Sequence, residues 1–300
     1  MLRRIVVAGI LIFLMGCVLV AGAQAVGAVT RTGVIVFSAR GLDLADLYLM
    51  DVERGTTINL TRSPRINENT PIWSPDGTRL LYNQLTANGQ SACVIRPFES
   101  TVPVCIDTDD PFVDHEGWSS DGQVYYAYLR SRYQSYQVDP SSGALLEQES
   151  FPHFSWRSSS RDGRYQINLT ADDRYQTLML IDGQNVTMET LVEAALFSTP
   201  PVFSADGSRI AFAAIWGDDP DLEIYTINTD GGDVRQLTVN DRRLDEGPTW
   251  SPDGQQIVFI SDIETGLRMG TNLYVMNADG SNLHRLTGDE MLYREPDWMP

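Results

Sequence analysis

A short motif, Ser-x-Asp-Gly, occurs five times in the chain and constrains the fold more than any other feature. Its aspartates, Asp76, Asp121, Asp162, Asp206 and Asp253, are separated by 45, 41, 44 and 47 residues. Short apolar runs flank the motif. A repeat length in the forties with short apolar strands is typical of a β-propeller made of four-stranded blades.

The motif itself predicts a tight turn between two strands. In the copy Ser251-Pro252-Asp253-Gly254, the proline presets φ for the first corner, and the aspartate can bond nearby backbone N–H groups. The glycine supplies a positive φ without steric cost. We therefore predict a structural role for these aspartates and for the glycines that follow them, Gly77, Gly122, Gly163, Gly207 and Gly254.

Four kinds of strand recur around these turns, and each kind occurs six times. The innermost strand carries an aromatic residue, at Trp73, Trp118, Trp156, Phe203, Trp250 and Trp298. Trp156 stands three residues further from its turn than the others do, which indicates an insertion or a bulge.

The order of the strands predicts how the ring closes. The chain starts on a second strand, Val34–Phe37, and ends on an innermost strand at Trp298. We therefore expect an all-β, six-bladed propeller of four-stranded antiparallel blades over residues 33–300, with 24 strands and almost no helix. Pairing of the N- and C-terminal strands would close the ring and remove exposed edges.

Residues 1–25 predict export from the cytoplasm. Arg3 and Arg4 precede an apolar run over residues 5–23, and Ala23-Gln24-Ala25 fits a signal-peptidase site. Two alternatives stay open. Leu14-Met15-Gly16-Cys17 resembles a bacterial lipobox, which would lipidate Cys17, and the run is long enough to stay as a membrane anchor. Each alternative places the chain in the periplasm or outside the cell, with residues 26–32 as a linker.

The charge of the chain excludes one class of partner. It carries 22 basic residues, all arginine, against 40 acidic residues, a net charge of −18. Such a surface repels nucleic acid and anionic lipid headgroups and favours basic partners or cations. We expect a monomer that binds no nucleic acid and meets the membrane only through its N-terminal segment.

The last two repeats, Pro201–Trp250 and Pro248–Trp298, share a longer pattern. It reads P-x-W-S-P-D-G or a close variant, then an apolar strand, then I/L-Y-x-M-N-x-D-G or a variant, then R-x-L-T. By these residues the region 33–300 resembles the TolB-type β-propeller repeat family. The resemblance implies a periplasmic or extracellular binding scaffold, and our leading hypothesis is a non-enzymatic module of the cell envelope that binds a protein or another ligand. We expect this chain to lack the α/β domain that precedes the propeller in TolB.

The sequence lacks the catalytic motifs of enzymes that carry similar repeats. The run Gly117–Asp121 departs from the nucleophile elbow G-x-S-x-G at its last position, and the chain contains no lysine. The histidines His115, His153 and His284 have no partner at metal-ligand spacing. Two alternatives to a binding scaffold stay open: a propeller enzyme, such as a metal-assisted polysaccharide lyase or hydrolase acting at the channel mouth, and a structural subunit of an envelope complex.

Topology predicts a binding site where the motifs do not. The connections that lead into the innermost strands are long, and long loops on a rigid scaffold are where binding sites usually lie. Their last residues should surround the mouth of the central channel. The predicted site residues are Glu68, Asn69, His115, Glu116, His153, Glu246, Arg294 and Glu295.

Four of these residues are glutamates at similar places in their repeats: Glu68, Glu116, Glu246 and Glu295. If they converge on the axis, their repulsion must be neutralised by a divalent cation or by an Arg or Lys side chain of a partner. The alternative is that they point into solvent or pair locally with Arg65, Arg243 and Arg294. No other cofactor is expected.

Cys93 and Cys105 flank a turn with equal arms of six residues, which places them opposite each other in neighbouring strands. An exported protein meets an environment in which disulfides form. We predict a disulfide between them, with two buried free thiols as the alternative.

Overall fold

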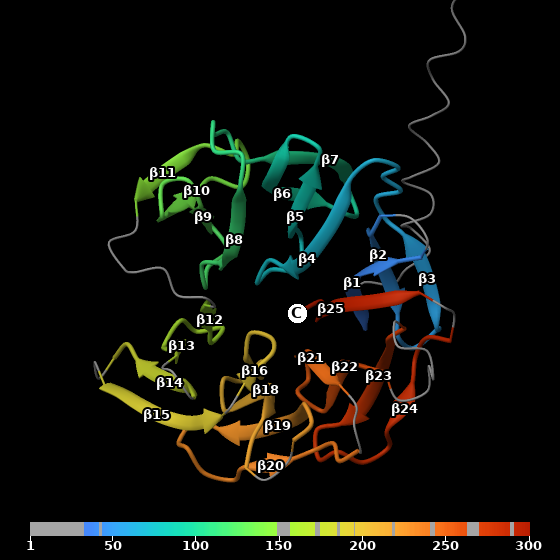
Figure 1. Cartoon of the computed structure of the whole chain (residues 1–300), viewed down its shortest axis with the longest axis vertical. Helices are drawn as coiled ribbons and strands as arrows, with labels where there is room; N and C mark the ends of the chain where they lie inside the picture. The colour runs from blue at the N-terminus through green and yellow to red at the C-terminus, as the bar shows by residue number, and fades with distance from the viewer. Residues whose placement is uncertain are drawn as a thin grey trace, which may run out of the picture.

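The computed structural model describes residues 33–41, 44–148, 157–171, 175–184, 187–194, 196–217, 220–240, 244–262, 270–288 and 291–300. Six antiparallel sheets are arranged as blades around a central axis (Figure 1). The prediction of an all-β, six-bladed propeller is confirmed, and no helix occurs among these residues.

The strands of each blade follow one another from the innermost to the outermost. Blades 1 and 2 consist of β25 (Leu292–Trp298), β1 (Val34–Arg40), β2 (Asp46–Asp51) and β3 (Thr56–Asn59), and of β4 (Asn67–Trp73), β5 (Leu80–Thr86), β6 (Gly89–Arg96) and β7 (Ser100–Cys105). Blades 3 and 4 consist of β8 (Val113–Trp118), β9 (Tyr125–Leu129), β10 (Gln134–Val138) and β11 (Leu145–Gln148), and of β12 (Arg157–Ser159), β13 (Tyr165–Ala171), β14 (Gln176–Asp182) and β15 (Thr187–Ala194). Blades 5 and 6 consist of β16 (Leu196–Phe197) with β17 (Val202–Phe203), β18 (Arg209–Ile215), β19 (Glu223–Asn228) and β20 (Arg235–Gln236), and of β21 (Asp245–Trp250), β22 (Gln256–Ser261), β23 (Asn272–Asn277) and β24 (His284–Arg285).

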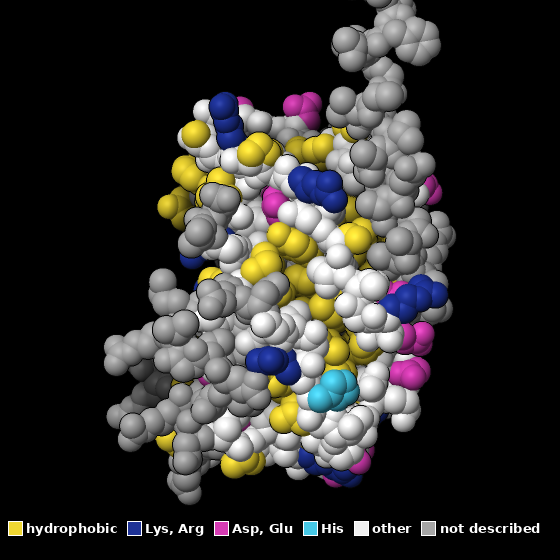
Figure 2. All heavy atoms as spheres, turned by 90° about the vertical axis from the view of Figure 1, so that its right-hand side faces the viewer, with side chains coloured by type: hydrophobic (Ala, Val, Ile, Leu, Met, Phe, Trp, Pro, Cys, Tyr) yellow, Lys and Arg dark blue, Asp and Glu magenta, His cyan; other side chains and the backbone are white. Residues whose placement is uncertain are grey.

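The hydrophobic core lies between neighbouring blades. Alternate residues of a strand point to opposite faces of its sheet, so one strand serves two interfaces. In β1, Val34 and Val36 pack against blade 2, whereas Ile35 and Phe37 pack against blade 6. Figure 2 faces the outer wall at β3 and β24 and shows a band of hydrophobic side chains along it. Burial of the sheet faces between neighbouring blades stabilises the ring.

The terminal strands close the ring as predicted. β25 pairs antiparallel with β1, with Ile35 opposite Trp298 and Val36 opposite Asp297. The C-terminus lies at the centre of the ring (Figure 1). Blade 1 is therefore built from both ends of the chain, and no sheet edge is left open at the junction.

The Asp-Gly turns have the same hydrogen bonds in every copy. Asp253 Oδ1 accepts from Ser251 Oγ at 2.6 Å and from Gln255 N at 3.0 Å, and Gly254 has φ of 66°. The bond from Ser251 is the main reason that the pKa of Asp253 is lowered. Asp76, Asp121, Asp162 and Asp206 make equivalent bonds.

The innermost strand of blade 5 differs from the expectation. It is split into β16 and β17, which both pair with β18, so the described residues form 25 strands and not 24. Pro200 and Pro201 lie between the two pieces. Proline has no N–H to donate to the sheet, so the ladder is interrupted there.

Several predictions fall outside the described residues. These are the signal peptide or anchor over residues 1–25, Cys17, the linker 26–32, Trp156 and His153. None of the described segments is a helix long and apolar enough to cross a membrane.

Candidate binding face at the channel mouth

The two ends of the propeller differ in their connections. We call the end that carries the Asp-Gly turns the turn face. The opposite end, at which the innermost strands begin, is called the loop face; among its described connections are 62–66, 107–112 and 130–133. The predicted site residues belong to the loop face and to the first half of the innermost strands.

A backbone bulge recurs where the innermost strands line the channel. Thr70, Gly247 and Glu295 have φ values of 50°, 64° and 53°, and each stands directly before a proline. The pairing register shifts at each of these positions. Left-handed φ is unfavourable for threonine and glutamate, and such strain is concentrated at functional sites. The bulges free the peptide groups of Thr70 from the ladder.

The peptide groups of Thr70 connect three blades around the channel. The Thr70 N–H donates to Glu295 Oε2 of blade 1 at 2.6 Å, and Glu295 also accepts from Ser38 Oγ at 3.3 Å. The Thr70 carbonyl lies 2.7 Å from Nε2 of His115 in blade 3. Because a carbonyl oxygen can only accept, Nε2 must carry the proton.

The tautomer of His115 leaves its second nitrogen as an acceptor. Nδ1 is buried, and no described residue donates a hydrogen bond to it. Burial lowers the pKa of His115 to about 4, so the ring is neutral near pH 7. The backbone N–H of His115 is held by Asn83 Oδ1 at 3.1 Å. His115 is therefore a neutral ring whose buried Nδ1 is a hydrogen-bond acceptor, and it is not a cation.

Among the described residues, acidic groups outnumber basic groups beside the hydrogen bonds that join Glu295, Thr70 and His115. Burial raises the pKa of Glu246, and the Arg294 charge opposes this shift while Glu295 and Asp262 reinforce it. Burial also raises the pKa of Glu295, against the hydrogen bonds from Thr70 and Ser38. Within the described segments, the charge of Glu246 thus interacts with one guanidinium, that of Arg294, and with two carboxyl groups, those of Glu295 and Asp262, an arrangement that favours a further positive charge.

The structure brings together only part of the predicted ring. Glu246, Arg294 and Glu295 interact electrostatically, and His115 joins them through Thr70. Asn69 precedes this link, and its Oδ1 lies 3.4 Å from Thr70 Oγ1. Glu116 is half-buried at the bulge of β8.

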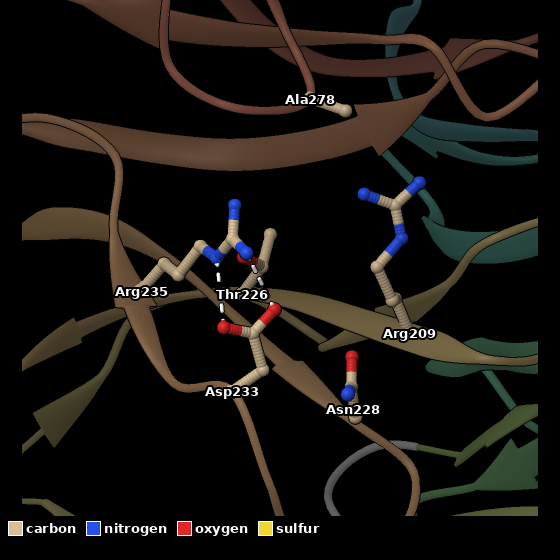
Figure 3. Close-up of a pocket in the computed structure, with 6 residues that line it drawn as sticks. All are labelled: Arg209, Thr226, Asn228, Asp233, Arg235 and Ala278. Carbon is tan, nitrogen blue, oxygen red and sulfur yellow. Dashed lines mark hydrogen bonds and ion pairs between the residues drawn. The ribbon is translucent and has the colours of Figure 1, made fainter.

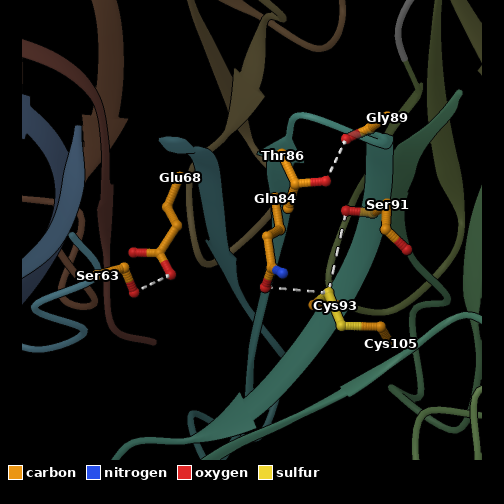
Figure 4. Close-up of a disulfide and its surroundings, with 8 residues drawn as sticks. All are labelled: Ser63, Glu68, Gln84, Thr86, Gly89, Ser91, Cys93 and Cys105. Carbon is orange, nitrogen blue, oxygen red and sulfur yellow. Dashed lines mark hydrogen bonds between the residues drawn. A yellow bond between two sulfur atoms is a disulfide. The ribbon is translucent and has the colours of Figure 1, made fainter. Parts of the chain in front are cut away.

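Glu68 does not lie at the mouth. It is 2 % exposed, and its Oε1 accepts a hydrogen bond of 3.1 Å from Ser63 of the connection from blade 1 (Figure 4). Burial raises its pKa. The expectation of four converging glutamates fails at this position because side chains of an innermost strand point alternately at the two neighbouring blades.

Two contributors were missed by sequence reasoning. Thr70 acts through its backbone, which no motif reveals. Asp297 accepts from Trp73 N at 2.7 Å and from Thr249 Oγ1 at 3.3 Å, and burial raises its pKa to about 6. The available signal was a carboxylate one residue before the end of the strand that closes the ring.

The loop face also carries most of the exposed hydrophobic side chains. Of twelve such large side chains among the described residues, eight lie on this face: Leu44, Leu85, Phe112, Tyr133, Tyr175, Leu196, Val239 and Leu244. Tyr133 is 81 % exposed, and Phe112 is 50 % exposed. Phe112 adjoins blade 2 because it bridges to Gln90. These eight side chains are distributed over all six blades, so they surround the channel mouth on one face of the propeller.

The disulfide of blade 2 braces this part of the ring. Cys93 is opposite Cys105 in the β6–β7 pairing, and their Sγ atoms are bonded (Figure 4). Cys93 is fully buried between blades 1 and 2. Within the described segments, no group of three or more His, Cys, Asp or Glu side chains is arranged to hold a metal ion.

Comparisons with known proteins agree with the fold. Residues 158–300 match the family described as TolB beta propeller domain. An uncharacterised protein of Agrobacterium fabrum is 26 % identical over 203 residues, which cover 62 % of this chain and 67 % of that protein. The structure of a TolB from Acinetobacter baumannii has a TM-score of 0.73 at 20 % identity and covers 92 % of this chain and 69 % of its own. A structure described as TolB from Agrobacterium tumefaciens has a TM-score of 0.68 at 20 % identity, covering 89 % and 95 %.

Enzymes share the same architecture. A Bacillus subtilis protein named as an uncharacterised peptidase is 29 % identical over 113 residues, 36 % of this chain and 17 % of that protein. An oligogalacturonate lyase in complex with manganese has a TM-score of 0.50 at 15 % identity, covering 84 % of this chain and 72 % of its own. At these identities the structural likeness concerns the fold alone, so function rests on the site.

Proposed function

Because this chain is a β-propeller of TolB-type repeats, we propose that it is an exported, non-enzymatic module that binds a protein partner of the cell envelope on its loop face. The observation that carries the proposal is the position of eight exposed hydrophobic side chains on that face. They would form the contact area, and the channel mouth would supply the specificity.

The electrostatics of the mouth define the partner further. In the part of the chain that the structure describes, Glu246 and Glu295 both interact with one arginine, Arg294, and the net charge of the chain is −18. A lysine or arginine side chain of the partner would neutralise the excess negative charge of these carboxylates. Such a contact adds specificity and speeds association at low ionic strength.

The proposal is tested by co-purification from the native cell envelope with matched variants. The loop-face double variant Phe112→Ser/Tyr133→Ser removes two exposed side chains from the loop face. The control, Val102→Ser/Leu146→Ser, removes two exposed side chains from the outermost strands β7 and β11. Quantitative mass spectrometry compares the proteins that each variant retains.

We expect the loop-face variant to retain at least about tenfold less partner than the wild type, as when hot-spot aromatic residues are removed. The control should retain as much partner as the wild type. Both variants should keep the wild-type melting temperature, since the residues are exposed. Equal retention of the partner by the two variants would refute the proposal that the partner binds on the loop face. Turnover of an acidic polysaccharide by the purified chain with a divalent cation would instead identify an enzyme.

A further inference from the structure

A polar cleft lies between blades 5 and 6 on the turn face, at the end opposite to the channel mouth. Its volume is about 410 Å³, within the range of small-ligand sites, and a smaller hollow of about 70 Å³ adjoins it. Blade 5 contributes Arg209 and Arg235, and the turns of blade 6 contribute Gln255, Asn277, Ala278 and Asp279. The cleft is independent of the function proposed above.

Arg209 is held in place by the neighbouring blade. Its Nη2 donates to the Gly254 carbonyl at 2.8 Å, and its Cζ lies 4.5 Å from the centre of the Trp250 ring. Among the described residues, it forms no ion pair within 4.0 Å. The charge of Asp206 interacts with that of Arg209 from beyond this distance, and the remaining N–H groups of Arg209 are oriented by the two contacts with blade 6.

Arg235 lies across the cleft from Arg209. Its Nε and Nη2 bind the two carboxylate oxygens of Asp233 at 2.9 and 2.8 Å. Figure 3 shows the guanidinium groups of Arg235 and Arg209 extending towards the same space beside Ala278, with Asp233 on the other side of Arg235. Two planar donors thus face one hollow, which is the chemistry that binds a carboxylate.

The rest of the lining suits hydroxyl groups. Asn228, Gln255 and Asn277 provide carboxamides and Thr226 provides a hydroxyl, groups that both donate and accept hydrogen bonds. Asp279 is partly satisfied by Ser281, whose N and Oγ bind its Oδ1 at 2.9 and 2.6 Å. Among the described residues of the lining, Ala278 is the only apolar one, so an apolar or aromatic ligand would gain little there.

A second repeat shows that the fold does not require both arginines. Between blades 2 and 3, Arg79 donates to the Gly122 carbonyl at 2.7 Å and lies 4.9 Å from the Trp118 ring, as Arg209 does between blades 5 and 6. The outermost strand there, β7, contains no arginine. The pairing of Arg209 with Arg235 therefore does not recur in the groove between blades 2 and 3.

We propose that this cleft binds a uronic-acid oligosaccharide, with the sugar carboxylate between Arg209 and Arg235 and the hydroxyl groups on the surrounding amides. The probes are trigalacturonate, the neutral trisaccharide maltotriose and the acidic peptide tri-glutamate. Isothermal titration calorimetry at low ionic strength measures each affinity. Thermal melting of every variant checks its folding.

Trigalacturonate should bind, maltotriose should bind at least tenfold more weakly, and Arg235→Gln should weaken trigalacturonate binding at least tenfold. Arg209→Gln should also weaken trigalacturonate binding at least tenfold, but this change removes the contact of Arg209 with Gly254 and Trp250 of blade 6 as well. The matched variant Arg79→Gln removes the equivalent contact between blades 2 and 3 and should leave binding unchanged.

The proposal is overturned if trigalacturonate does not bind or if Arg235→Gln binds it as well as the wild type. Equal binding of maltotriose would overturn the role of the carboxylate. Binding of tri-glutamate as tight as that of trigalacturonate would overturn the assignment to a sugar acid.

Discussion

The carboxylate of Asp297 accepts a 2.7 Å hydrogen bond from the backbone nitrogen of Trp73, although the two residues are 224 positions apart in the chain. Asp297 lies in the innermost strand of blade 1 and Trp73 in that of blade 2. Thr249 Oγ1 of blade 6 donates to the other oxygen at 3.3 Å. One carboxylate therefore connects the three blades around the closure of the ring.

Stability should depend on pH through Asp297. Burial raises its pKa to about 6 in the folded chain, against about 3.9 in an unfolded chain. The native state then binds the proton more tightly, so the free energy of unfolding is highest below pH 4 and falls as pH rises through 6. Asp297→Asn lacks this loss, so its free energy of unfolding should rise by on the order of 2–3 kcal/mol relative to that of the wild type between pH 4 and 7.

Urea unfolding of both proteins from pH 4 to 8 measures this change. Asp253→Asn is the control of opposite sign, because hydrogen bonds lower the pKa of Asp253. Its turn stabilises the native state above the unfolded pKa and loses this contribution as pH falls. A constant difference between Asp297→Asn and the wild type over the whole range would contradict the account.

The contrast between these two aspartates explains what the sequence could predict. The bonds of Asp253 reach only to Ser251 and Gln255, so the Ser-x-Asp-Gly pattern contains all the information. The bonds of Asp297 reach Trp73 and Thr249 on other blades. They depend on ring closure and on a bulge at Glu295, and neither is visible in a local pattern.

Removal of residues 294–300 should destabilise the whole ring. It deletes most of β25, including the buried Trp298, and leaves β1 with an unpaired edge. Loss of one buried tryptophan alone costs about 3–5 kcal/mol, so the melting temperature should fall by at least about 10 °C. A melting curve that coincides with that of the full chain would exclude this closure.

The disulfide should stabilise blade 2. It joins residues 12 positions apart, and a loop of this size corresponds to about 3 kcal/mol. Cys93→Ser/Cys105→Ser should therefore unfold at a lower urea concentration than the wild type. Reducing agent should lower the midpoint of the wild type and leave that of the double variant unchanged. Two titratable thiols from Cys93 and Cys105 in unreduced, denatured protein would show that the bond is absent.

The channel mouth shows where prediction from the sequence ends. Because strands alternate in direction, the order of the strands was enough to predict that the residues of the candidate site lie on the loop face or in the first half of the innermost strands. It could not tell that Glu68 faces blade 1 and Ser63 while Glu295 faces Thr70. A bulge of one residue reverses the direction of a side chain, and the residues that form it are identified only when the strands are paired.

The most direct test of the proposed function is hydrogen–deuterium exchange of the chain with and without the partner that it retains from the envelope. Protection should appear at 84–90, 110–114 and 130–134 on the loop face and at 244–247 beside Glu246. The Asp-Gly turns at 74–79 and 251–256 should exchange at unchanged rates. Protection of the turns with no change on the loop face would contradict the proposal that the partner docks over the channel mouth.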